Sequence, residues 1–205
     1  MRTLGMLRQL AEQKAAGPTP SFTELHLAKA IEIMGRERVG RIGLSGRLGL
    51  GEGATRTLID RLLEARLVKI SKRGCELTGT GLSIMKHLNS KLGAKARVSR
   101  SPITVGPYDF GILVRKAANK VSNAIEQRDA AVRAGANGAV TLVFRNGQLL
   151  MPSADGSKIR QSTDVVKQVV KNLRPGENDV IVIAGGDTER LAEDGAWAAA
   201  WTLVK

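Results

Sequence analysis

The sequence is poor in the residues that build disulfide frameworks, zinc sites and common catalytic pairs. Its 205 residues include one cysteine, Cys75, and two histidines, His26 and His87. A single cysteine excludes an internal disulfide, and with only two histidines a structural zinc site is not expected. Residues 101–205 contain neither histidine nor cysteine, so the usual nucleophile and base pairs are missing from that half. We therefore expect no metal, no cofactor and no enzymatic activity.

Long hydrophobic runs are missing as well. No segment approaches the ~18 consecutive apolar residues of a membrane helix. Residues 1–4 lack a continuous hydrophobic signal core, so the sequence predicts a cytoplasmic protein without a membrane partner. Hydrophobic residues make up 42% of the chain, which is enough for the cores of one large or two small domains.

Acidic residues are scarce in one half of the chain only. The formal net charge is +13. Residues 1–100 carry 19 Lys and Arg against 8 Asp and Glu, whereas residues 101–205 carry 13 against 11. Neutralising DNA phosphates requires a local excess of cations of this kind. The first half is therefore predicted to bind DNA with an affinity that falls steeply as salt rises.

The stretch 43–81 has the pattern of a winged helix-turn-helix. It predicts, in order, a short helix, a tight turn, a second helix and a β-hairpin, at residues 44–48, 49–53, 54–66 and 67–77. The hairpin turn, Lys72-Arg73-Gly74, is basic. In proteins with this arrangement the second helix enters the major groove of DNA.

Burying Leu58, Ile59 and Leu62 of the second helix leaves arginine and threonine side chains on its outer face. Arginine pairs bidentately with guanine, and the N–H groups at a helix N-terminus receive phosphate. Arginines beside the first motif helix are placed to contact phosphates without reading sequence. The predicted partner is double-stranded DNA, contacted by Arg41, Arg47, Gly53, Arg56, Thr57, Arg61, Lys69, Lys72 and Arg73. A solvated amphipathic surface helix is the alternative for this face.

Residues 48–85, LGLGEGATRTLIDRLLEARLVKISKRGCELTGTGLSIM, resemble the winged-helix domain of a family of archaeal proteins classed as transcriptional regulators. Members of that family carry a C-terminal α+β domain of unknown function, and the resemblance extends to residues 124–129 and 134–139. It implies that residues 54–66 are the recognition helix and residues 69–77 the wing. It implies neither a ligand nor a target gene.

Composition and pattern divide the chain into two domains of α+β class. The run GAKARVSRS at 93–101 is polar, basic and rich in small residues, which is typical of a linker. Strand, helix, hairpin, helix, strand and helix follow, which predicts a helix-covered, mainly antiparallel sheet. The predicted segments are an N-terminal extension, a winged helix domain, a linker and an α+β dimerisation or effector domain, at residues 1–20, 21–93, 94–101 and 102–205. A winged helix that reads paired half-sites favours a homodimer.

A glycine pair in the second domain is a candidate anion site. Gly185 and Gly186 follow a predicted buried strand and precede a predicted helix, where free amides attract a phosphate or carboxylate. A tight turn with Asp187 as the helix cap is the alternative. The residues predicted for a small anionic effector are Arg128, Gly185, Gly186 and Thr188.

These features predict a DNA-binding transcriptional regulator with a C-terminal domain for dimerisation and ligand sensing. Two alternatives stay open. One is a nucleoid-type DNA-binding protein without an effector, and the other is a small-molecule enzyme whose winged helix is only an interaction module.

Overall fold

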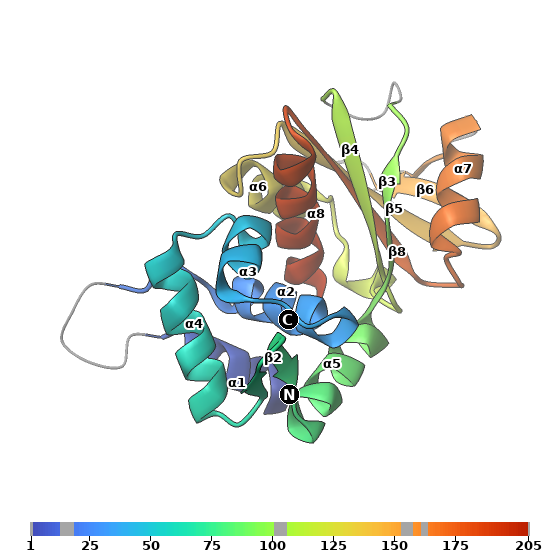
Figure 1. Cartoon of the computed structure of the whole chain (residues 1–205). Coiled ribbons are helices and arrows are strands. Elements are labelled where there is room, and N and C mark those ends of the chain that lie inside the picture. The colour runs from blue at the N-terminus through green and yellow to red at the C-terminus, as the bar shows by residue number, and fades with distance from the viewer. Residues whose placement is uncertain (1, 13–18, 101–105, 153–157, 161–163, 205) are drawn as a thin grey trace. The chain divides into compact units, whose positions relative to one another are not determined.

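The computed structural model describes residues 2–12, 19–100, 106–152, 158–160 and 164–204 (Figure 1). The chain forms two compact units, the first ending at Asn89 and the second beginning at Ser90.

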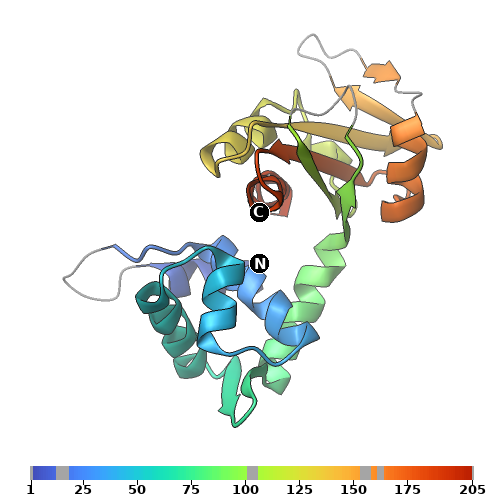
Figure 2. The same ribbon diagram turned by 45° about the horizontal axis from the view of Figure 1, so that its top comes forward.

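The first unit consists of helices and a two-stranded ribbon. Its elements are α1 (Arg2–Ala11), α2 (Glu24–Arg36), α3 (Arg41–Leu48), α4 (Glu52–Glu64), β1 (Val68–Ser71), β2 (Gly74–Leu77) and α5 (Gly79–Lys91). Strands β1 and β2 pair antiparallel, and Val39 forms a bridge to Cys75 of β2. This is the predicted order of helix, turn, helix and hairpin (Figure 2), and Lys72 and Arg73 stand at the turn of the hairpin. Residues 13–18 of the predicted N-terminal extension lie outside the described residues.

The turn between α3 and α4 is fixed by local hydrogen bonds. Gly49 adopts a left-handed conformation with φ 65°, which glycine reaches without steric cost, and its N–H donates to the Ser45 carbonyl. The Ser45 hydroxyl donates to the Leu50 carbonyl at 2.6 Å. Fully buried leucines of both helices then hold the pair together, namely Leu44, Leu58 and Leu62. The side chains opposite to this core are left on the outer face of α4.

The second unit is built on a six-stranded sheet of order β3-β4-β8-β5-β6-β7, in which every neighbouring pair is antiparallel. The strands are β3 (Leu92–Val98), β4 (Tyr108–Val114), β5 (Gly138–Arg145), β6 (Gln148–Pro152), β7 (Lys158–Arg160) and β8 (Val180–Gly186). The helices are η1 (Ala118–Lys120), α6 (Ile125–Arg133), α7 (Asp164–Leu173) and α8 (Glu189–Val204). The predicted hairpin forms at β5 and β6, with positive φ at both Asn146 and Gly147.

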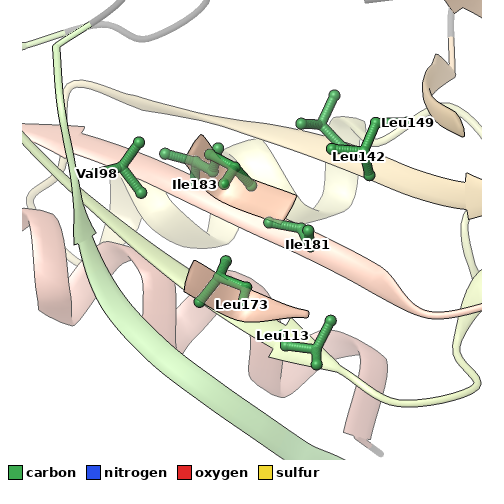
Figure 3. Packing of buried hydrophobic residues seen from close by; sticks show 8 residues of the cluster. Val98, Leu113, Leu142, Leu149, Leu173, Ile181 and Ile183 are labelled. Carbon is green, nitrogen blue, oxygen red and sulfur yellow. The ribbon is translucent and has the colours of Figure 1, made fainter. Parts of the chain in front are cut away.

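Both faces of this sheet are covered, because β8 is buried along its whole length. Ile181 and Ile183 pack with Leu113, Leu142 and the α7 residue Leu173 on one face (Figure 3). Ala184 points to the other face, where Gly195 lets α8 approach it closely. A Cβ at Gly195 would lie 3.2 Å from that of Ala184 and 2.4 Å from that of Ala136. The sheet is thus a three-layer arrangement of α7, strands, and α6 with α8.

The segment predicted as a linker, 94–101, is largely strand. Residues Leu92–Val98 form β3, which pairs with β4 at the edge of the sheet. Its basic residues, Lys95 and Arg97, suit an edge strand, where charge discourages pairing with another chain. The Lys95 ammonium lies over the Trp197 ring at 5.0 Å, and Arg97 pairs with Glu189. Residues 101–105, at the predicted start of the second domain, lie outside the described residues.

Candidate nucleic-acid interface

The outer face of α4 is a continuous exposed stripe. Its members recur at three- and four-residue intervals and are exposed, namely Glu52, Gly53, Arg56, Thr57, Asp60 and Glu64. Arg56 is 73% exposed and lies 4.0 Å from the Asp60 carboxylate one turn later. The Thr57 hydroxyl donates to the Gly53 carbonyl at 3.2 Å. Three of the predicted contact residues, Gly53, Arg56 and Thr57, are therefore brought together on one surface.

Arg61 does not belong to this stripe, which corrects its assignment as a DNA contact. Its side chain is buried, and one guanidinium nitrogen donates to the carbonyls of Leu10 and Glu12 at 2.6 Å each. The guanidinium carbon also lies 5.2 Å from the centre of the Phe22 ring. These contacts use the charge of Arg61 inside the unit, where it ties α4 to the end of α1.

The two arginines predicted beside the first motif helix are held by carboxylates. Arg41, at the start of α3, lies 3.5 Å from Glu52, and Arg47, near its end, donates to Glu37. The hydrogen bond and charge of Arg47 lower the pKa of Glu37, so this carboxylate is ionised at neutral pH. All four side chains are about half exposed. Part of the positive charge of Arg41 and Arg47 is thus already balanced by carboxylates, which reduces what these arginines offer to a phosphate.

The wing carries one compensated and one uncompensated group of cations. Lys69 lies 3.2 Å from Glu76, which also accepts a hydrogen bond from Arg38. Hydrogen bonds from Arg38 and Lys69 lower the pKa of Glu76. Lys72 and Arg73 at the tip are exposed, and in the described part of the chain no carboxylate pairs with either. Their positive charge is therefore available to a polyanion without rearrangement.

A groove of about 620 Å³ runs between α3, α4 and the wing. It is lined by Gly40, Arg41, Ile42, Gly43, Arg56, Ile59, Asp60, Ile70, Gly74 and Cys75. Ile42 and Ile70 are exposed, whereas Ile59 and Cys75 are buried. Burial raises the pKa of the Cys75 thiol, which stays neutral. Neither isoleucine was predicted as a contact residue. The signal for Ile70 was its alternation with Lys69, which places it on the same face of the ribbon as the buried Val68 and its pairing partner Cys75.

In the second unit, Gly185 and Gly186 form the end of strand β8 and not a loop. Gly185 pairs with Asp109 on one side and Gly138 on the other, and its carbonyl accepts the Asn137 N–H at 2.8 Å. A Cβ at Gly186 would lie 2.7 Å from the Ala192 nitrogen. Gly185 pairs with both neighbouring strands of the sheet, and Gly186 lets α8 approach the end of β8 closely. A valine at Gly186 would consequently disturb the fold, whether or not an anion binds.

The other two residues predicted for an effector are engaged elsewhere. The Thr188 hydroxyl accepts the Leu191 N–H at 3.2 Å, so Thr188, and not Asp187, caps α8. Gln127 donates to Thr202, which places the neighbouring Arg128 beside the last turn of α8. Gly186 lies against Ala192 in the first turn of α8. Ala192 and Thr202 are ten residues apart, which is about 15 Å along the helix. The predicted effector residues therefore do not form one site, and the effector stays a prediction.

Metal and membrane features are absent from the portion of the chain that the structure describes. No cluster of three His, Cys, Asp or Glu side chains is placed to hold a metal ion among those residues. None of their helices is long and apolar enough to cross a membrane.

Comparison with known proteins also divides the chain into two parts, although the two matches meet at residues 102–105 and the two compact units meet at Asn89 and Ser90. Residues 25–102 match the family model described as the CggR N-terminal DNA binding domain, and residues 105–203 match a domain of unknown function, DUF4443. No curated protein matches the sequence.

One solved structure is similar over nearly the whole chain. It is the hypothetical protein PH0730 from Pyrococcus horikoshii OT3, with 25% sequence identity and a TM-score of 0.72 over 89% of this chain and 93% of that one. Together with the matched domains, this confirms the predicted fold class, α+β in two domains, with an N-terminal helical DNA-binding domain followed by a helix-covered antiparallel sheet.

Proposed function

We propose that the protein is a sequence-selective, DNA-binding transcriptional regulator. The observation that carries this proposal is the exposed stripe of α4, which presents Arg56 and Thr57 beside an uncompensated basic wing tip. Similarity of residues 25–102 to a DNA-binding domain supports it. In this arrangement α4 enters the major groove, Arg56 pairs with a base edge, and Lys72 with Arg73 holds phosphates.

The charge on α4 favours selective binding over uniform coating of DNA. Glu52, Asp60 and Glu64 lie on the same stripe as Arg56, so this face repels phosphates unless its polar groups find matching base edges. Carboxylates accept hydrogen bonds from the amino group of cytosine, which gives them a role at a preferred sequence only. A protein that coats DNA by backbone contacts needs cations there instead. A nucleoid-type role is therefore the weaker alternative.

Replacing Arg56 by alanine tests the assignment. We expect about 1–3 kcal/mol weaker binding to the preferred site and relaxed selectivity at one base pair, because a bidentate base contact is lost. The measurement is a fluorescence-anisotropy titration with the selected site and with its single-base variants.

Arg8→Ala is the matched control. Arg8 is also an exposed helical arginine, with its partner Glu12 one turn away at 4.0 Å, but it lies on α1. The proposal predicts unchanged selectivity for this variant. Equal losses for Arg8→Ala and Arg56→Ala would mean that only net charge matters and would refute base reading by α4.

We also propose that the second unit assembles the protein as a homodimer through the outer face of α6. Ile125 and Val132 are 42% and 50% exposed and lie two turns apart on one line of the helix. At about 100° per residue, Arg128 flanks that line on one side and Asp129 on the other. If the two-fold axis is parallel to α6, the two copies of this helix run side by side in the same direction. The Arg128 side of each copy then faces the Asp129 side of the other, beside a centre formed by Ile125 and Val132. If the two copies of α6 ran antiparallel, Arg128 of one copy would lie against Arg128 of the other, and the like charges would repel.

The dimer proposal predicts that Val132→Glu weakens self-association at least tenfold, because an uncompensated charge enters the apolar centre beside Asp129. Sedimentation velocity over a concentration series measures the dissociation constant. Leu82→Glu is the control, since Leu82 is also an exposed apolar residue, at 41% against 50% for Val132, but lies on α5. A wild-type protein that stays monomeric, or a Val132→Glu variant as dimeric as wild type, would exclude this face.

Catalysis forms no part of the proposed function. The second unit has an assembly role in this proposal, in keeping with the lack of histidine and cysteine in residues 101–205.

A further inference from the structure

The groove beside α4 exposes more apolar surface than the fold requires. Ile42 is 71% and Ile70 64% exposed, the highest values for large hydrophobic side chains in the described part of the chain. The two side chains come from different elements, α3 and β1, yet line the same groove. Exposed apolar surface gathered in a concave site marks a contact region. Single exposed isoleucines scattered over a surface would carry no such meaning.

The remaining lining makes the groove apolar at its base and charged at its rim. Ile59 and Cys75 are both only 5% exposed, and three glycines, Gly40, Gly43 and Gly74, contribute no side chains that would fill it. Because the Cys75 thiol is neutral, no charge lies among these buried groups. Charges enter only through Arg41, Arg56 and Asp60. The Asp60 carboxylate accepts hydrogen bonds and donates none, so an occupant presents an apolar or hydrogen-bond-donating surface beside it.

Arg56 connects this groove to the proposed DNA interface, because it belongs both to the exposed stripe of α4 and to the groove lining. Because Arg56 lines the same groove as Ile42 and Ile70, a base next to the one that Arg56 contacts would face these isoleucines when α4 lies in the major groove. The apolar group that the major groove offers is the C5 methyl of thymine, since the other edge groups are hydrogen-bond donors and acceptors. The chemistry of the groove therefore matches a thymine next to the base that Arg56 contacts.

We infer that Ile42 and Ile70 form a pocket for thymine methyl groups and so determine which sequences the protein prefers. The inference rests on the proposed function, because it requires α4 to enter the major groove. It assigns a sequence-reading role to residues of α3 and the wing, which otherwise serve phosphate contacts. Arg56 fixes the register, and the two isoleucines favour a thymine at an adjacent position over cytosine, which lacks the methyl group.

The test leaves the protein unchanged and removes single methyl groups from DNA. The preferred site of the full-length protein is first obtained by selection from randomised duplexes. Each thymine of that site is then replaced, one at a time, by deoxyuridine, which pairs identically but lacks the C5 methyl. We expect about fourfold weaker binding at one or two thymines, the effect of one buried methyl group, and no change at the others.

Variants then locate the effect on the protein. In Ile42→Ala/Ile70→Ala the deoxyuridine penalty at those thymines should vanish, while in Leu82→Ala, an equally mild change on α5, it should persist. Circular dichroism confirms that each variant is folded. A selected site without thymine, binding indifferent to every deoxyuridine, or a penalty that survives the double substitution would overturn the pocket while leaving a selective regulator intact. Failure to select any site would instead refute the proposed function together with this inference.

Discussion

Replacing Arg61 by alanine will lower the free energy of unfolding of the first unit by about 2–4 kcal/mol, although this residue was predicted to contact DNA. The variant loses two charge-assisted hydrogen bonds to the Leu10 and Glu12 carbonyls and the stacking on Phe22. Native-state hydrogen exchange of α2 and α4 amides measures that free energy, and exchange in α1 should rise most. Because Arg61 is buried and its guanidinium is hydrogen-bonded within the unit, we expect the salt dependence of DNA binding to keep its slope.

Arg61→Met separates the two components of this effect. Methionine retains much of the apolar stem over Phe22 but none of the hydrogen bonds, so its stability should lie between those of wild type and Arg61→Ala. Arg56→Ala, on the exposed stripe, should leave stability within about 0.5 kcal/mol of wild type. An Arg61→Ala protein of unchanged stability, with a shallower salt slope, would restore the DNA contact and contradict the structural role.

The error over Arg61 shows where helical periodicity stops being informative. The pattern of α4 correctly separated Leu58 and Leu62 from Arg56 and Thr57, because both sets belong to one helix. Position 61 lies at the border between these faces. Its environment is decided by the carbonyls of Leu10 and Glu12, about fifty residues earlier in the chain, which no local pattern reports.

The second unit shows the same division between local and long-range information. Turn chemistry at Asn146-Gly147 was sufficient to predict the hairpin of β5 and β6, since both residues adopt positive φ. The insertion of β8 between β4 and β5 joins strands far apart in the chain and was not deducible from pattern. Strand β3 was mistaken for a linker because its edge position lets basic residues alternate with small ones, and composition alone does not distinguish the two cases.

The candidate interface was predicted in outline but not in its electrostatics. The basic excess of residues 1–100 correctly indicated the half of the chain that matches a DNA-binding domain. The same charge count treated Arg41 and Arg47 as cations available to DNA. Ion pairs with Glu52 and Glu37 depend on how α3 is placed, and they reduce what these arginines offer to DNA. The wing tip keeps its charge because it projects from a short hairpin beyond the reach of those carboxylates.

The wing tip should consequently dominate the salt dependence of binding. If Lys72 and Arg73 each hold one phosphate, Lys72→Ala/Arg73→Ala should make the slope of log K against log salt shallower by about 1.8 units. Between 0.05 and 0.2 M salt this corresponds to about a twelvefold smaller change in affinity than for wild type. Anisotropy titrations at four salt concentrations measure both slopes, with the selected site and an unrelated duplex, and the change should be the same for both because phosphates carry no sequence.

Lys86→Ala/Lys91→Ala is the control for this prediction, since it removes the same net charge from exposed positions on α5. If only the overall net charge of the protein matters, both double variants will reduce the slope of log K against log salt by the same amount. If the wing tip lies on the phosphates, the α5 variant will change the slope of log K against log salt by only a small fraction of the change that the wing variant causes. The reason is that exposed charges more than a Debye length from the DNA are largely screened. Equal slopes for the two variants would place the DNA away from the wing and would remove the orientation on which the role of α4 depends.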